Sequence, residues 1–166
     1  SDTSFSQYNR SRATLKDSSE AKTGCIKAGI GTAGNAINIC AGTFTLESGN
    51  IYSKNNALLI DEQAATVNIN GGMITAETAT KNSAVMYISS TSETVVNITA
   101  GELVGYNGIL LWNNTELNIT GGTINATGSV AIQGNGSNDN TEINISGDAT
   151  TISGYYSAIY HPQGGE

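Results

Sequence analysis

The chain has 166 residues, the length of one domain with a single core. Charged residues make up only 13% of it, well below the ~25% typical of soluble domains, and Asn, Thr, Ser and Gly take their place. This excludes charged coiled coils and amphipathic bundles, which need many ions on their solvated faces. The formal net charge of −7 excludes a basic nucleic-acid-binding surface.

Positive charge is confined to the first half of the chain. No Lys or Arg follows Lys81, so residues 82–166 carry the whole net charge of −7, while residues 1–81 are neutral overall. An acidic half of this kind repels phosphates and anionic membranes, and no apolar run approaches the ~18 residues of a membrane span. The charge therefore predicts a neutral glycan or a protein as partner, with no nucleic acid and no direct membrane insertion.

Residues 1–34 form an N-terminal segment without the periodicity that follows. Its Phe5, Tyr8 and Leu15 could lie over the first coil of a repeat array as a cap, which such arrays need. We therefore expect two parts, with 1–34 as a possible cap and 35–166 as the repeat region.

Two cysteines, Cys25 and Cys40, are 15 residues apart. A disulfide between them would close a short loop and contribute roughly 3 kcal/mol. The alternative is a pair of buried free thiols in neighbouring strands, and the spacing does not decide between the two. The chain has no CxxC pair and no Cys/His cluster, so we predict no metal site.

From residue 35 onward one motif recurs at irregular intervals. It reads Val-Asn-Ile-Asn-Gly-Gly at 67–72, Val-Asn-Ile-Thr-Ala-Gly at 96–101 and Leu-Asn-Ile-Thr-Gly-Gly at 117–122, with weaker copies at 37–42 and 143–148. Its Asn falls at positions 38, 68, 97, 118 and 144, which gives spacings of 30, 29, 21 and 26 residues. A second apolar run follows each copy and begins at a small residue, at 57, 84, 108, 129 and 158.

Short strands, glycine corners and a variable period predict a parallel solenoid. Helical repeats have fixed lengths and a 3.6-residue period, and a propeller blade needs about 40 residues. We therefore predict an all-β chain, a right-handed parallel β-helix of about five to six irregular coils stacked at ~4.8 Å. The Asn of each motif should face outward, where stacked Asn, Thr and Ser form hydrogen-bonded ladders rather than a flat ice-binding lattice.

Alternation along the second apolar run predicts which residues face outward. The uniformly branched column is expected in the core; it consists of Leu58, Val85, Ile109, Val130 and Ile159. The opposite parity then places an apolar stripe on the surface. Its members are Met86, Ile88, Leu110, Trp112 and Tyr160, with Asn113 and Gln133 beside them. Exposed Trp and Tyr stack on sugars or anchor protein interfaces, so these seven are the candidate ligand-binding residues. The alternative is that another segment, domain or copy covers the stripe.

The Asn-Ile-Thr-Gly-Gly-Thr-Ile-Asn-Ala motif at 118–126, with its copies, resembles the β-helical repeats of large surface proteins from Gram-positive gut bacteria. Some relatives of that family are labelled carbohydrate-binding repeat domains. The segment Ser-Ala-Ile-Tyr-His-Pro-Gln at 157–163 is similar to a recurrent coil segment of the same proteins. The resemblance covers about residues 35–166. It implies a secreted or cell-wall location, adjacent domains in a longer chain, and a solenoid truncated at its C-terminus.

Polysaccharide lyases and glycoside hydrolases are the enzymes to consider for a β-helix. A lyase needs a strong base, and no Lys or Arg lies beyond Lys81. A glycosidase needs two carboxylates ~5–10 Å apart, and the expected column neighbours of Asp61 and Glu102 are not acids. The one histidine, His161, has no Ser or Cys nucleophile pattern beside it, and the loop at Asn138 lacks the ligand spacing of a calcium loop. We therefore predict a non-catalytic, adhesin-like segment with no cofactor. The alternatives are a structural stalk and a fragment of a polysaccharide-degrading enzyme.

Overall fold

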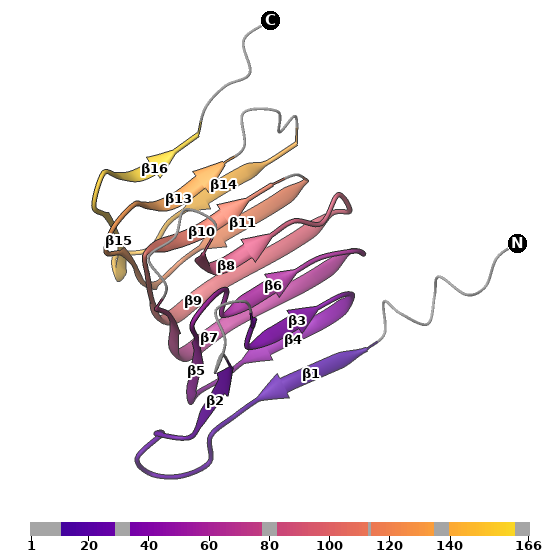
Figure 1. Ribbon diagram of the computed structural model, residues 1–166, viewed down its shortest axis with the longest axis vertical. Coiled ribbons are helices and arrows are strands. Elements are labelled where there is room, and N and C mark those ends of the chain that lie inside the picture. The colour runs from indigo at the N-terminus through magenta and orange to yellow at the C-terminus, as the bar shows by residue number, and fades with distance from the viewer. Residues whose placement is uncertain (1–10, 29–33, 78–82, 113, 135–139, 162–166) are drawn as a thin grey trace, which may run out of the picture.

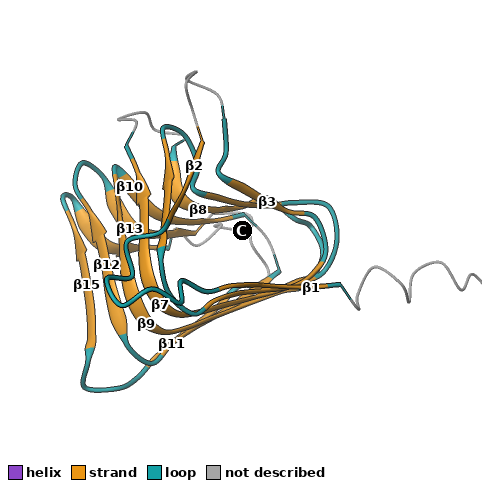
Figure 2. Cartoon of the chain, turned by 90° about the horizontal axis from the view of Figure 1, so that it is seen from below, coloured by secondary structure: helices purple, strands orange, loops and turns teal. Residues whose placement is uncertain are grey.

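The computed structural model describes residues 11–28, 34–77, 83–112, 114–134 and 140–161, and their regular structure is entirely β-strand. The strands stack in parallel as a β-solenoid of about five turns, which confirms the predicted fold. Figure 1 shows the coils stacked between the two ends of the chain. Seen along the stack, each coil surrounds the interior on three sides (Figure 2). Among the described residues no helix has the length and hydropathy needed to cross a membrane.

The first side of the coil carries the repeated motif. Its strands, in order along the stack, are β1 (Arg12–Leu15), β4 (Gly42–Leu46), the first part of β7 (Ala65–Ala76), the first part of β9 (Thr94–Gly105), β11 (Thr115–Ile119) and β14 (Glu142–Ile145). Side chains alternate between the two faces of a strand, so the aliphatic residues of each motif point inward. Val67 and Ile69 are fully buried, whereas Asn68 between them is half-buried on the outside.

The second side follows a glycine bend. Its strands are β2 (Cys25–Ala28), β5 (Asn50–Ser53), the later parts of β7 and β9, β12 (Gly122–Ala126) and β15 (Thr150–Gly154). Gly72 and Gly101 at the bend have φ of 80° and 101°, the left-handed region that side chains disfavour. A Cβ on Gly72 would also lie 2.4 Å from the carbonyl oxygen of Gly49 in the coil below. Glycine is therefore required here both for the backbone turn and for the close approach of coils.

The third side is a separate six-stranded parallel sheet. Its strands are β3 (Ile37–Ile39), β6 (Leu58–Ile60), β8 (Ala84–Ile88), β10 (Asn107–Leu111), β13 (Val130–Gly134) and β16 (Ser157–Tyr160). They correspond to the second apolar run of the sequence, together with the 37–39 segment. This sheet presents the outer face on which the candidate residues were predicted.

The N-terminal segment contributes strands to the same stack. β1 pairs with β4, and β2 pairs with β5, both in parallel. Leu15 lies opposite Leu46 and packs against the core. Phe5 and Tyr8 lie outside the described residues.

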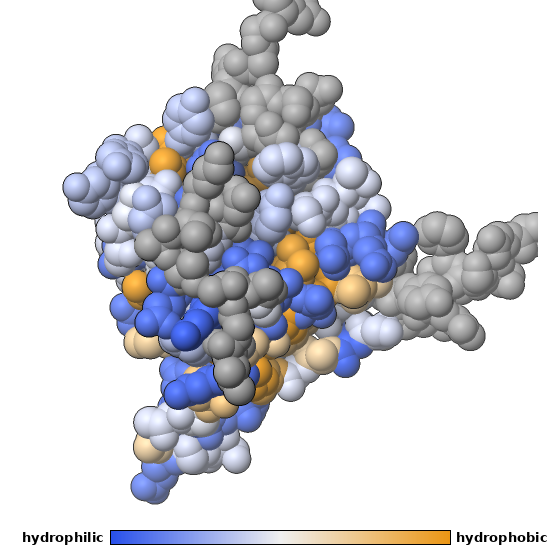
Figure 3. All heavy atoms as spheres, viewed as in Figure 1, coloured by the Kyte–Doolittle hydropathy of each residue, from blue (hydrophilic) through white to orange (hydrophobic). Residues whose placement is uncertain are grey.

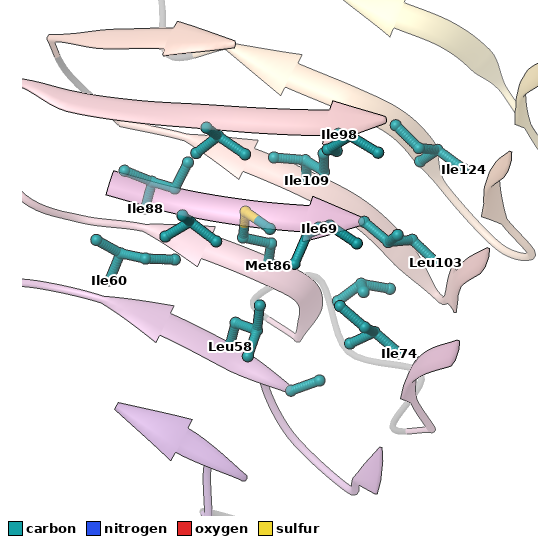
Figure 4. Close-up of a cluster of buried hydrophobic side chains, with 14 of the residues drawn as sticks. Leu58, Ile60, Ile69, Ile74, Met86, Ile88, Ile98, Leu103, Ile109 and Ile124 are labelled. Carbon is teal, nitrogen blue, oxygen red and sulfur yellow. The ribbon is translucent and has the colours of Figure 1, made fainter. Parts of the chain in front are cut away.

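The core is a set of apolar columns that run through the coils. In one of them Leu46, Ile69, Ile98 and Ile119 lie on consecutive coils, each at most 1% exposed. Figure 4 shows side chains from opposite sides meeting in this interior. Full burial of such a side chain stabilises the fold by about 1.5–3 kcal/mol, so these columns supply most of the stability.

The outward Asn residues of the motif form a hydrogen-bonded ladder, as predicted. The side-chain amide of Asn68 donates to the Thr45 hydroxyl at 3.3 Å, and that of Asn97 donates to the Asn68 carbonyl oxygen at 2.9 Å. Asn118 donates to Asn97 at 3.1 Å, and Asn144 donates to Asn118 at 3.0 Å. Each central amide thus both donates to and accepts from a neighbouring coil.

Replacing a central ladder residue should destabilise the fold more than replacing the terminal one. Asn97→Ala removes two ladder bonds, at about 0.5–1.5 kcal/mol each, whereas Asn144→Ala removes one. Urea unfolding followed by circular dichroism measures both losses, and the two variants share the same change in chemistry. Equal losses would mean that the ladder bonds do not contribute to stability.

Candidate functional site

The outer face of the third sheet carries one outward column across six coils. Register pairing places its members side by side in the order Asn38, Leu59, Tyr87, Leu110, Gln133 and Tyr160. Trp112 follows Leu111 and lies just beyond this column. Its backbone N–H donates to the Ile88 carbonyl at 2.9 Å, as that of Ser89 does to Ile60 one coil earlier.

The structure corrects the predicted orientation of Met86 and Ile88. Both are fully buried, and Figure 4 shows them in the core beside Leu58 and Ile60. The strand pairing matches Leu58 with Met86, whereas the sequence alignment matched it with Val85. A slip of one residue moves every side chain of a strand to the opposite face. Met86 and Ile88 therefore cannot contact a ligand on this face.

The cause of the slip lies at the start of β8. Ser83 before the strand and Ala84 and Val85 at its start are all buried, so the small residue there does not mark the register of β8. Val85 fills the space beside Gly105, where an added Cβ would lie only 2.8 Å from a Val85 methyl group. Further along the stack, Ile109 is matched with Ile132 rather than with Val130, which is only half-buried.

Leu110 requires a smaller correction. It belongs to the outward column, yet it is only 8% exposed because its register neighbours Tyr87 and Gln133 flank it. It supports the surface rather than projecting from it.

Three of the predicted residues do face outward. Trp112 is 46% exposed, Tyr160 is 50% exposed, and Gln133 is half-buried. Asn113 lies outside the described residues.

Tyr87 is a surface aromatic that the sequence analysis missed. Its ring meets that of Trp112 edge to face, with centroids 6.0 Å apart and planes at 85°. The correct register of β8 would have revealed it, because Tyr87 has the parity of Leu59 and Leu110. We call the surface formed by Leu59, Tyr87, Leu110, Trp112, Gln133 and Tyr160 the aromatic face.

On the visible part of this side of the molecule, Figure 3 shows the most hydrophobic residues as separate orange patches among polar ones. A second exposed aromatic pair, Tyr155 and Tyr156, lies in the turn between β15 and β16, with ring centroids 4.8 Å apart. The aromatic face itself is a single column of side chains with Trp112 just beyond it, and this second pair lies outside it.

A carboxylate pair lies on the first side of the coil. Glu116 and Glu142 are register partners in β11 and β14, so their strands are ~4.8 Å apart. The Asn118 amide donates to the Glu116 carboxylate at 2.9 Å. The pair was not predicted from the sequence, although each Glu precedes its ladder Asn by two residues and the two Asn residues pair in register. Within the described residues no group of three or more His, Cys, Asp or Glu could hold a metal ion, and Asn138 lies outside them.

The structure has no disulfide between the two cysteines, and it contradicts the alternative in the burial and placement of the thiols. Cys25 and Cys40 are free thiols, and both are exposed. Cys25 lies in β2 on the second side, whereas Cys40 follows β3 at the corner before β4, so they are not neighbours in one sheet. Partial desolvation of the Cys40 thiol, with the Asp61 carboxylate beside it, raises the pKa of Cys40.

Comparisons with protein-family models, curated proteins and solved structures found no match for this chain. The fold is therefore established by its strand pairing alone. The resemblance to bacterial surface repeats remains a prediction from the sequence motifs.

Both cysteines should react with iodoacetamide in the folded protein without a reductant, giving two adducts by mass spectrometry. The thiolate is the reactive form, so Asp61→Asn should speed labelling at Cys40 severalfold at neutral pH by removing a negative charge. Cys25 provides the internal control. A disulfide would instead block both sites until reduction.

The register of β8 can be tested by truncating two adjacent residues. Met86→Ala should lower the free energy of unfolding by about 2–5 kcal/mol because it leaves a cavity in the core. Tyr87→Ala should cost less, since that ring is partly in water. Denaturant unfolding measures both, and the reverse order would indicate the register in which Val85 matches Leu58.

Proposed function

We propose that this chain is a non-catalytic, adhesin-like segment that binds a neutral glycan on its aromatic face. The observation that carries the proposal is the Tyr87–Trp112 pair, an indole 46% exposed to solvent and held edge to face by a neighbouring ring. A rigidly held, exposed aromatic ring is the group on which the apolar face of a sugar stacks.

The parallel sheet suits the repeating geometry of an oligosaccharide. Its side chains recur at ~4.8 Å from coil to coil, so Trp112 and Tyr160 present two exposed rings along one track. Gln133, between Leu110 and Tyr160 in the column, offers both a donor and an acceptor to sugar hydroxyls. Stacking with a few hydrogen bonds is enough for a ligand that is itself amphipathic.

The charge of the chain favours a neutral ligand over an anionic one. No Lys or Arg lies beyond position 81, and Asp61 occupies the same position as Trp112 two coils earlier, directly after its strand. An anionic sugar such as a uronate would meet repulsion without a cationic partner.

A small ligand also fits the aromatic face better than a protein does. A stable protein interface buries about 800 Å² on each partner, with aromatic residues in a dry centre. The aromatic face is a single column with Trp112 beside it, and Gln133 separates Leu110 from Tyr160, so it suits a few sugar rings. We place this segment at the surface of a bacterial cell, next to other domains, on the basis of the motif resemblance.

A structural stalk is the second candidate function. The hydrogen-bonded Asn ladder and the continuous core columns favour it, because they make the stack stiff along its length. A stalk would hold other domains away from a surface without binding a ligand of its own.

A neutral-glycan array and affinity electrophoresis with mucin test the proposal. Trp112→Ala should weaken binding at least tenfold, the loss expected for an aromatic residue at the centre of a site. Tyr156→Ala is the matched control, because that ring is 73% exposed but lies in the β15–β16 turn, outside the aromatic face. Equal losses in both variants would contradict a site at Trp112.

The same assays separate the alternatives. If the intact chain binds no glycan, the stalk becomes the better proposal. Cleavage of a neutral polysaccharide that disappears in Glu116→Gln would instead indicate a hydrolase that uses the Glu116–Glu142 pair.

A further inference from the structure

Trp112 belongs to a second outward column, which runs along the corner between the third and the first side of the coil. The backbone N–H groups of Asp61, Ser89 and Trp112 each donate to the carbonyl oxygen of the last strand residue one coil earlier, at 3.2, 2.9 and 2.9 Å. The three residues therefore occupy the same position on three successive coils, directly after β6, β8 and β10. We call them the corner column.

The two outer members of the corner column differ in chemistry, and the residue between them is small. Trp112 is 46% exposed, and the Tyr87 ring meets it edge to face. Ser89 is half-buried, and its hydroxyl donates back to the Ile60 carbonyl at 3.4 Å. Two strand spacings, ~10 Å, separate Trp112 from Asp61. This span suits two linked sugar rings, one stacked on the indole and one beside the carboxylate.

Within the described part of the chain, the Asp61 carboxylate has no cationic partner. The residue is half-buried, and its Oδ1 atom is shut off from water without a hydrogen-bond partner. The Cys40 thiol lies beside it and is only a weak hydrogen-bond donor. A partly desolvated carboxylate without a counter-ion is unfavourable. A cation beside Asp61 would offset this cost, whereas a neutral hydroxyl would supply a hydrogen bond alone.

The surface around the corner column is acidic. Strands β6, β8 and β10 with the corners that follow them, residues 58–64, 84–93 and 107–114, contain Asp61, Glu62 and Glu93 and no Lys or Arg. Glu62 and Glu93 are both exposed. Such a surface raises the local concentration of cations and repels anions. The exposed indole of Trp112 acts in the same direction, because the face of an aromatic ring attracts a positive group.

We propose that the aromatic face recognises an amino sugar, with the ammonium group on Asp61 and the adjoining sugar ring on Trp112. The inference rests on the proposed glycan-binding function and names the class of glycan, an oligosaccharide of hexosamine units whose amino groups are free rather than acetylated. The ammonium group adds a charge-assisted hydrogen bond to the stacking that a neutral glycan makes at the same site. Asp61 is then the residue that determines specificity, and Trp112 supplies affinity for either form.

A pair of oligosaccharides that differ only in acetylation tests the proposal. Isothermal titration calorimetry compares the glucosamine tetramer with the N-acetylglucosamine tetramer at mildly acidic pH, where the sugar amines are protonated. The chain should bind the amine form roughly fivefold more tightly, and added salt should reduce the preference. Equal affinity for the two tetramers, or a preference for the acetylated one, overturns this proposal but leaves the glycan-binding function intact. Binding of neither overturns both.

Three variants locate the preference. Asp61→Asn should remove it while the acetylated tetramer still binds, and Trp112→Ala should weaken the binding of both tetramers. Glu102→Gln is the matched control, because it removes the same charge from an exposed position on the second side of the coil and should keep the preference. Circular dichroism and urea unfolding check that each variant is folded. An equal loss of preference in Glu102→Gln, or displacement of the amine tetramer by tetralysine at equal concentration, would indicate unspecific charge attraction and overturn the proposal.

Discussion

Every part of this molecule depends on one constraint, the stacking of parallel strands in register at ~4.8 Å. The constraint places each side chain directly on its counterpart in the next coil, so a column must tolerate its own residue type repeated. Aliphatic residues meet this condition inside, as in the column of Leu46, Ile69 and Ile98. Asparagine meets it outside, because its amide both donates and accepts and can therefore hydrogen-bond to an identical neighbour.

The same constraint accounts for the unusual composition of the chain. A column of identical ions would place like charges on neighbouring strands, which destabilises a sheet. Asn, Thr and Ser therefore occupy outward columns where most soluble proteins have Lys and Glu, and charged residues are only 13% of the chain. The Glu116–Glu142 pair departs from this rule, and the Asn118 amide donates a hydrogen bond to one of the two carboxylates.

The sequence predicts the fold and the first side of the coil well. The Val-Asn-Ile motif shows which side chains alternate between inside and outside, and its repetition shows which residues pair on successive coils. The prediction fails on the third side. There the apolar run has no polar residue at a fixed position to indicate which side chains face outward. Ser83, Ala84 and Val85 at the start of β8 are all buried, so the first small residue does not indicate which positions pair. The one-residue error placed the buried Met86 and Ile88 on the surface and concealed the outward Tyr87. Trp112, Gln133 and Tyr160 were assigned correctly to the outside, and Leu110 was assigned to the correct face although its neighbours cover it. The arrangement of the cysteines could not be predicted for another reason. Fifteen residues of chain span more than one side of a coil, so the spacing of Cys25 and Cys40 does not indicate on which side each lies.

The aromatic face follows from the same constraint that builds the core. Because the columns repeat along one axis, a ring placed on one coil has a defined distance to a ring on any other, which suits a ligand that is itself a repeating chain. The stiffness of the stack and a glycan-binding role are thus compatible consequences of the same in-register stacking.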